Sequence, residues 1–438
     1  MQHKNKKEPV VVVSVRMADG TQIETIYSKE TKNTGLCVYK DGDWRITEAV
    51  EHAGGATYVP TSSPLPDLGV LLLASSPEQY QSVESLVEEI RRYIHRYVDL
   101  PPSFEILVSY YVLLTWVHEA FAELGYIRFV GDLGSGKTRA LNIVGAICLR
   151  ALFASGAATV SPIFWFLDQW KGTLVFDETD FRASDMTSDM TKLFNNGSTK
   201  GFPILRQTVS QKGVMSPRAF QVFGPKIVSM RSTFEDLALE SRFFTCEMGH
   251  HVMRQDVPIN LPDVYKDEAA QLRNKLLLYR FQNLDKMQAD SSLVDSAFSG
   301  RVNQILVPLL SVIPSEEHRH IVREAVAEIQ EKQKARRSAS VEAEVLEVVA
   351  DLLADEAGGE VRLSDITALF VLRYGKDYER PITNRYVGEI VRSKLHIFSY
   401  KKRGVYVIPV SEREKVKVLA ARYGIVKEKT GKEPTSGG

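Results

Sequence analysis

The chain has 438 residues, of which 44% are hydrophobic and 25% are charged, a composition that excludes a disordered or fibrous protein. This length predicts roughly two to four domains, because single cores stop growing at about 250–300 residues. Lys plus Arg and Asp plus Glu number 55 each, so the net charge is zero. No global field attracts the chain to nucleic acid, and any such contact must come from local patches.

The cysteines and the apolar segments indicate in which cellular compartment the protein is expected. Cys37, Cys148 and Cys246 are far apart and lack metal-ligand spacing, which favours buried thiols in a reducing environment. The most apolar run, 106–122, is interrupted by polar residues such as His118 and predicts a buried helix rather than a membrane span. The polar opening is not typical of a signal peptide. We therefore expect a cytoplasmic protein without a membrane partner.

Residues 1–75 are expected to form a small β-rich domain. Asp-Gly pairs at 19–20 and 41–42 are typical of turns between strands. A Pro/Ser-rich passage at 60–67 marks the boundary. The role of this domain does not follow from its residues. Its predicted strands are 10–17, 21–27, 37–39 and 44–46.

Residues 76–124 are expected to form a helical linker. The pattern is helical from 78 to 98, and the Pro101-Pro102 pair then stops the helix before a second helix leads to Leu124. Strand and helix patterns alternate through 125–255, which predicts an α/β domain.

Residues 131–138, GDLGSGKT, fit the phosphate-binding pattern G-x-x-x-x-G-K-[ST]. A buried strand is predicted before them at 126–130, and a helix after them at 138–153. The glycines allow backbone N–H groups and the helix N-terminus to converge on phosphate oxygens. The loop predicts binding of ATP, with Lys137 on the β- and γ-phosphates and Thr138 on Mg²⁺. The expected nucleotide contacts are Gly131, Asp132, Leu133, Gly134, Ser135, Gly136, Lys137 and Thr138.

Further along, a hydrophobic strand at 174–176 delivers Asp177 and Glu178. We expect Asp177 to orient the magnesium ion and its waters. We expect Glu178 to align and deprotonate the attacking water. The adjacent glutamate favours hydrolysis over nucleotide binding alone.

A further short strand at 224–231 ends in polar groups and precedes 238–244, ALESRFF. The order of the motifs resembles that of AAA+ ATPases. The glycine loop comes first, followed by the Asp-Glu strand, the polar-ended strand and Leu-x-Ser-Arg. The resemblance is to minichromosome-maintenance helicases and, more closely, to the helicase-like ATPases of phages and integrative mobile elements. It covers roughly residues 100–310. It implies an AAA+ core at 125–255, a helical lid at 256–330 and a ring-shaped homo-oligomer, a hexamer.

The same resemblance implies roles for three arginines. Arg242 would be an arginine finger donated to ATP on a neighbouring subunit, a cation that can be worth roughly 10³–10⁵ in rate. Arg231 occupies the sensor-one position, where the family more often has Asn or Thr, and Ser229 is the alternative. Arg301 opens a helix that resembles the sensor-two helix and would contact the γ-phosphate. The alternative for Arg301 is a solvated side chain at a helix start.

Two β-like runs within 200–225 flank the sequence SQKG at 210–213 and predict a hairpin. Its position is similar to that of the pre-sensor-one hairpin of AAA+ helicases, which implies that Lys212 at the tip holds a phosphate of single-stranded DNA in the central channel. The alternative is a solvent-exposed turn with one cation.

After a charged connector at 331–338, the segment 338–424 resembles a winged-helix domain. Arg385 and Arg392 on its third helix would enter a DNA groove. The predicted helices are 341–354, 364–374 and 382–395, followed by a ribbon at 397–410 and a polar, disordered tail at 425–438. The ribbon would offer Lys401, Lys402 and Arg403 to phosphates. A protein interface is the alternative, because the first of these helices is acidic.

The favoured interpretation is an ATP-dependent DNA helicase or translocase that serves replication of a mobile genetic element. One alternative is a nucleotide-switched DNA-binding initiator or regulator without translocation. Another is a protein-remodelling or defence ATPase, which would need an aromatic pore loop. Phe164, Trp165 and Phe166 are available for that loop, but their helical spacing favours core packing.

Overall fold

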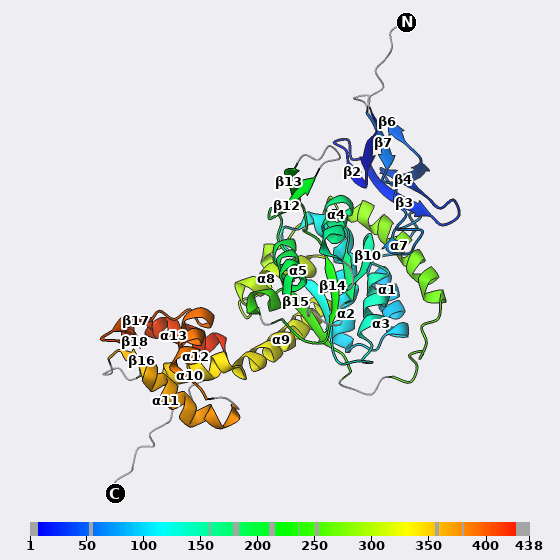
Figure 1. Cartoon of the computed structure of the whole chain (residues 1–438). Coiled ribbons are helices and arrows are strands. Elements are labelled where there is room, and N and C mark those ends of the chain that lie inside the picture. Colours follow the sequence, from blue (N-terminus) through cyan, green and yellow to red (C-terminus); the bar gives the residue numbers. More distant parts are fainter. Residues whose placement is uncertain are drawn as a thin grey trace. The chain divides into compact units, whose positions relative to one another are not determined.

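The computed structural model describes residues 8–51, 56–156, 159–177, 184–209, 215–234, 236–249, 254–354, 359–378 and 381–425 (Figure 1). The chain divides into two units, Met1–Val326 and Ala327–Gly438. No helix within the described ranges combines the length and the apolar character that crossing a membrane requires.

A six-stranded sheet lies at the centre of the first unit, with the order β15-β9-β14-β11-β10-β8. Every neighbouring pair is parallel except β10 with β8. β9 and β14 are buried at every residue, as expected for parallel strands covered on both faces. The predicted α/β class is confirmed. The strands are β8 (Leu71–Leu72), β9 (Tyr126–Val130), β10 (Ala151–Ser155), β11 (Leu174–Asp177), β14 (Lys226–Met230) and β15 (Phe243–Glu247).

The apolar segment predicted as a buried helix is α2, which is buried over nearly its whole length. Pro102 is its first residue, because a proline at that position loses no helical hydrogen bond. The Pro101-Pro102 pair therefore also starts a helix. The helices up to β15 are α1 (Val83–Tyr97), α2 (Pro102–Val117), α3 (Lys137–Gly145), α4 (Val160–Trp170), α5 (Ser184–Gly197) and α6 (Leu237–Glu240).

The prediction of one helix over 138–153 is wrong. α3 ends at Gly145, and β10 pairs with β11. Arg150 has a φ angle of 43°, a left-handed conformation that ends the turn before the strand. A short apolar run such as 149–153 fits a buried strand as well as a helix, so its periodicity could not decide between them.

The N-terminal β-rich region predicted from the sequence is present. One sheet has the order β2-β3-β4-β5 and another the order β1-β7-β6. Asp41 and Gly42 form the turn between β4 and β5 with φ angles of 51° and 99°. The strands are β1 (Val10–Val12), β2 (Ser14–Arg16), β3 (Gln22–Ser28), β4 (Asn33–Lys40), β5 (Asp43–Thr47), β6 (Val50–Glu51) and β7 (Thr57–Pro60).

A buried group of charges ties this N-terminal region to the central sheet. Glu24 on β3 accepts hydrogen bonds from Arg150, which precedes β10, and from Arg280 at 2.7 Å. Arg280 also pairs with Glu119 at 2.7 Å. Burial alone would raise the pKa of Glu24, but the two guanidinium groups outweigh it and lower the pKa. Each buried charge therefore has an opposite partner, which offsets its desolvation.

Three further helices follow β15: α7 (Val264–Asn283), α8 (Gly300–Ser311) and α9 (Glu316–Ser338). The charged connector expected at 331–338 is the last part of α9, which runs from the first unit into the second.

The second unit contains the predicted helices and ribbon. Its sheet has the order β16-β18-β17. The final turns of the third predicted helix form a π-helix, Ile390–Lys394. β16 and α13 were not predicted from the sequence. β16 has only two residues, which is too few to show a periodic pattern. The elements are α10 (Val341–Ala354), β16 (Val361–Arg362), α11 (Leu363–Tyr374), α12 (Asn384–Glu389), β17 (Tyr400–Lys402), β18 (Val405–Ile408) and α13 (Arg413–Arg422).

The change Glu24→Gln should lower the stability of the first unit by about 3–5 kcal/mol, because it leaves two buried guanidinium groups with one carboxylate. The pKa of Glu24 is lower in the folded chain, so its contribution is present above about pH 4.3 and is lost as the pH falls. Thermal unfolding measured at neutral pH would show the effect. The exposed residue Glu30, changed to Gln, is the control. Equal unfolding midpoints for the two variants would contradict this account of the network.

Candidate nucleotide site

The glycine loop between β9 and α3 has a backbone that only glycine adopts easily. Gly134 and Gly136 have φ angles of 79° and 89°, where residues with side chains are strained. A Cβ atom on Gly131 would lie 2.6 Å from the carbonyl oxygen of Met248. Gly136 directly precedes α3, so the free N–H groups of the first helical turn open into the loop. This arrangement suits an anion such as a phosphate.

The ammonium group of Lys137 lies inside the loop. Its Nζ atom donates to the carbonyl oxygen of Asp132 and, at 3.3 Å, to Oγ of Ser135. Burial, and then the charge of Arg231, lower the pKa of Lys137. Anionic phosphate oxygens would give this ammonium stronger partners than the two neutral oxygens that it contacts here.

Asp177 joins three segments at the carboxyl edge of the sheet. Its Oδ2 atom accepts a hydrogen bond from Oγ1 of Thr138 at 3.0 Å, and its Oδ1 atom accepts one from Oγ of Ser229. Ser229 reaches Asp177 because β14 lies between β9 and β11, with these two residues paired in register. Hydroxyl and carboxylate oxygens are ligands that Mg²⁺ prefers. Thr138 and Asp177 therefore fit a magnesium ion bound together with phosphates.

Arg231, the first candidate for sensor one, also belongs to this edge. Arg231 directly follows β14, is exposed, and lies near enough to Lys137 to affect its pKa. The contact with Asp177 comes from Ser229, the alternative candidate for sensor one. Glu178 lies outside the described residues; in the sequence it directly follows Asp177.

Arg242 and Arg301 lie at the opposite edge of the sheet. The N–H group of Tyr126, the first residue of β9, donates to the carbonyl oxygen of Arg242, whereas the glycine loop follows the last residue of β9. A five-residue strand spans roughly 17 Å. Arg301 is close enough for its charge, after burial, to lower the pKa of Arg242. The structure therefore groups these two arginines away from the loop of their own chain.

The predicted hairpin is present as β12 (Ile204–Val209) and β13 (Met215–Phe220), which pair antiparallel. The last pair in register is Val209 with Met215, so 210–214 connects the strands. Lys212 belongs to this connection and lies outside the described residues.

The base of the hairpin is attached to the two helices that flank β11 in sequence. Arg206 and Arg218 are directly paired across the strands, and each has an aspartate partner. Arg206 pairs with Asp189 of α5 at 2.7 Å, and Arg218 pairs with Asp168 of α4 at 2.8 Å. The guanidinium of Arg218 also lies 3.8 Å from the ring centroid of Trp165. These contacts link the hairpin to both neighbours of the strand that carries Asp177.

In the second unit, Arg385 is exposed on α12. Arg392 is exposed on the π-helical turn, and its guanidinium lies 4.8 Å from the ring centroid of Tyr406. The ring attracts the guanidinium to its face, and the N–H groups at the edge of the guanidinium stay accessible to another ligand.

The ribbon carries the other three predicted cations. Lys402 pairs with Glu360 at 2.7 Å, whereas Lys401 and Arg403 are exposed around the turn. Arg403 and Gly404 form that turn with φ angles of 47° and 88°. The ion pair leaves Lys401 and Arg403 better placed than Lys402 to contact a phosphate.

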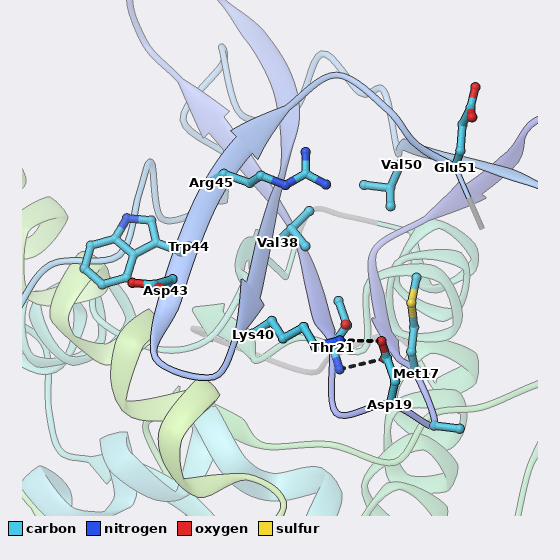
Figure 2. A pocket seen from close by; sticks show the side chains of 11 residues that line it. Met17, Asp19, Thr21, Val38, Lys40, Asp43, Trp44, Arg45, Val50 and Glu51 are labelled. Atoms are coloured by element: carbon cyan, nitrogen blue, oxygen red, sulfur yellow. Dashed lines mark hydrogen bonds and ion pairs between the residues drawn. The ribbon is translucent and has the colours of Figure 1, made fainter. Parts of the chain in front are cut away.

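A pocket lies in the N-terminal region (Figure 2), and none of its lining residues belongs to the glycine loop. Its lining includes Asp19, Asp43 and Glu51 as well as Lys40 and Arg45. Lys40 donates to Asp19 at 2.8 Å, and this bond is the main reason why the pKa of Asp19 is lowered. With carboxylates balancing its cations, the pocket offers no excess positive charge to a triphosphate.

No protein-family model and no curated protein matches the chain. Among solved structures, the apo C-terminal region of NrS-1 is 12% identical, with a TM-score of 0.38 over 89% of this chain and 96% of that one. SCCmec type IV Cch, described as an active helicase, is 11% identical, with a TM-score of 0.36 over 94% and 95%. A full-length MCM homolog from Methanopyrus kandleri is 10% identical, with a TM-score of 0.35 over 67% and 68%.

The chain resembles helicase structures. Two of these structures are named as a helicase and as an MCM homolog, which are kinds of protein that the resemblance drawn from the sequence also named. The TM-scores are low, so the case for an activity rests on the residues of the site.

The sequence alone did not indicate that Arg206 and Arg218 hold the hairpin. A signal was present, because both arginines are six residues from Lys212 and therefore suit opposite positions in a hairpin. The grouping of Arg242 with Arg301 had no comparable signal, since it depends on how distant segments pack.

The change Asp177→Asn keeps the size of the side chain but removes the charge that suits a magnesium ion. We expect Mg²⁺ to tighten ATP binding to the unchanged protein, and to do so at least tenfold less in the variant, while the fold is retained. Calorimetric titration with and without Mg²⁺ measures this difference. Asp41→Asn, in a surface turn, is the control. Equal magnesium dependence in both variants would refute the metal role of Asp177.

The change Lys137→Ala should abolish ATP binding, because Lys137 is the only cation among the described loop residues 131–138. Direct binding of a fluorescent ATP analogue is the measurement. Unchanged affinity would mean that the nucleotide binds elsewhere.

Proposed function

We propose that this chain is an ATP hydrolase that works as a DNA helicase or translocase. The observation that carries the hydrolase assignment is the contact of Thr138 and Ser229 with Asp177 beside the glycine loop. The loop and Lys137 would hold the phosphates, while Thr138 and Asp177 would hold Mg²⁺, which neutralises charge on the phosphate oxygens. Glu178 would orient and deprotonate the attacking water.

The position of Arg242 supports a site shared between copies of the chain. Its backbone aligns with the start of β9, roughly 17 Å along the strand from the loop. An arginine at that distance cannot reach a γ-phosphate on its own loop, but it can face the loop of a neighbour. We propose that Arg242, with Arg301 beside it, completes the site of the next subunit in a ring, which the AAA+ resemblance suggests is a hexamer.

The rest of the chain is assigned by resemblance. We propose that 125–255 is the AAA+ core, 256–330 the helical lid and 338–424 a winged-helix domain. Residues 1–75 are the β-rich N-terminal domain, joined to the core by a helical linker at 76–124. The tail 425–438 lies almost wholly outside the described residues.

Two surfaces would contact DNA. The hairpin would present Lys212 to a single strand in the central channel, and its attachment to α4 and α5 supports movement with the nucleotide site. Exposed Arg385, Arg392, Lys401 and Arg403 would give the second unit a cationic surface for duplex phosphates and bases. The resemblance to ATPases of mobile elements supports a role in replication of such an element.

The exposed cations of the second unit also favour a second candidate, a DNA-binding initiator that does not translocate. A protein-remodelling ATPase is less favoured. Phe164 and Phe166 are buried in α4, and Trp165 is stacked with Arg218, so these aromatics do not form a pore loop.

Single-stranded DNA should stimulate ATP turnover severalfold more than duplex DNA or polypeptide, because the hairpin would couple strand contact to hydrolysis. Steady-state ATPase assays with each polymer measure this. A non-hydrolysable ATP analogue should also shift the protein to a larger species in light-scattering chromatography. A monomer whose turnover ignores every oligonucleotide would refute the helicase assignment.

The change Glu178→Gln should stop turnover but preserve ATP binding, because the amide cannot accept the proton of water. Arg242→Ala should lower turnover roughly 10³–10⁵-fold through the other half of the site, which leaves a small residual rate. Mixtures of the two variants should regain activity, since some interfaces then combine an intact Glu178 with an intact Arg242. Absence of recovery at every mixing ratio would contradict a shared site.

A further inference from the structure

The side chain of Arg242 is held by two neighbouring elements. Its Nε atom donates to Oγ of Ser198 at 3.0 Å, and its Nη1 atom donates to the carbonyl oxygen of Ala238 at 2.6 Å. Ala238 belongs to α6, and Ser198 directly follows α5. A guanidinium has five N–H donors, so these two bonds fix its direction and leave three donors for another ligand.

Both supports of Arg242 are themselves fixed within the core. Arg128, fully buried on β9, forms a two-bond ion pair with Glu240 at the end of α6. Such paired bonds set the orientation of both groups. The helix turn that supplies the carbonyl oxygen of Ala238 is therefore tied to the strand that leads into the glycine loop.

The end of α5 is fixed by a buried lysine and a tyrosine. Lys226 is fully buried and donates to the carbonyl oxygens of Gly197, Val222 and Gly224. A donor at this point satisfies a carbonyl oxygen that has no partner within the last turn of the helix. The hydroxyl of Tyr126 donates to the carbonyl oxygen of Phe194 at 2.9 Å. Ser198 itself is only 3% exposed.

Helix α5 begins seven residues after Asp177 in the chain and ends beside Tyr126, and its 14 residues span about 20 Å. The same helix carries Asp189, which holds Arg206 at the base of the hairpin. One helix therefore holds the hairpin through Asp189 and leads directly into Ser198, which holds Arg242.

We propose that Ser198 is a positioning residue that aims Arg242 at the nucleotide of the neighbouring subunit, so that α5 couples the site of one subunit to that of the next. This inference rests on the proposed role of Arg242 in catalysis. Ser198 does not touch ATP in this account. It acts by holding the guanidinium, together with the carbonyl oxygen of Ala238, in one direction.

The test compares kcat and KM for ATP in full-length variants. Ser198→Ala should lower kcat roughly tenfold, the expected effect of losing one hydrogen bond to a charged group, and should leave KM unchanged. Ser198→Thr keeps the hydroxyl and should retain most of the turnover. Ser109→Ala is the matched control, because Ser109 is also buried but bonds only within its own helix, to the carbonyl oxygen of Glu105.

A second comparison separates positioning from a general loss of structure. In an Arg242→Ala background, Ser198→Ala should have no further effect on kcat, because the group on which it acts is gone. An equal loss in both backgrounds would overturn the inference, as would normal turnover in Ser198→Ala. Normal turnover in Arg242→Ala would instead refute the proposed role of the arginine, and the inference with it.

Discussion

The carboxylate of Asp177 is the point on which the account of this chain depends. It accepts hydrogen bonds from Thr138, at the end of the glycine loop, and from Ser229, on the strand between β9 and β11. Parallel pairing brings the carboxyl ends of these strands to one edge, so a loop, a carboxylate and a hydroxyl meet there. The chemistry of this edge suits a triphosphate with a magnesium ion.

The opposite edge of the same sheet has a different character. There Arg242 and Arg301 lie together, and a lysine and a tyrosine hold the end of α5. In the ring that we propose, the arginine edge of one copy would meet the loop edge of the next, since strands separate these two edges within one chain.

The local parts of this picture could be predicted from the sequence. The glycine loop and the strand that ends at Asp177 are short motifs that local spacing reveals, and Asp-Gly turns placed the N-terminal strands well. β10 was predicted as helix because a short buried run has no distinctive period. The contact between Ser229 and Asp177 depends on strand register, and the contact between Ser198 and Arg242 depends on two helices packing on the same edge. No local pattern reports either of them.

The most direct test of the central claim is an experimental structure of the assembled protein with Mg²⁺ and a non-hydrolysable ATP analogue. We expect each nucleotide to lie on the glycine loop, with its metal at Thr138 and Asp177. We also expect Arg242 of the adjacent subunit to make hydrogen-bonding contact with the γ-phosphate. A nucleotide enclosed only by residues of its own chain, with Arg242 turned to solvent, would contradict this claim.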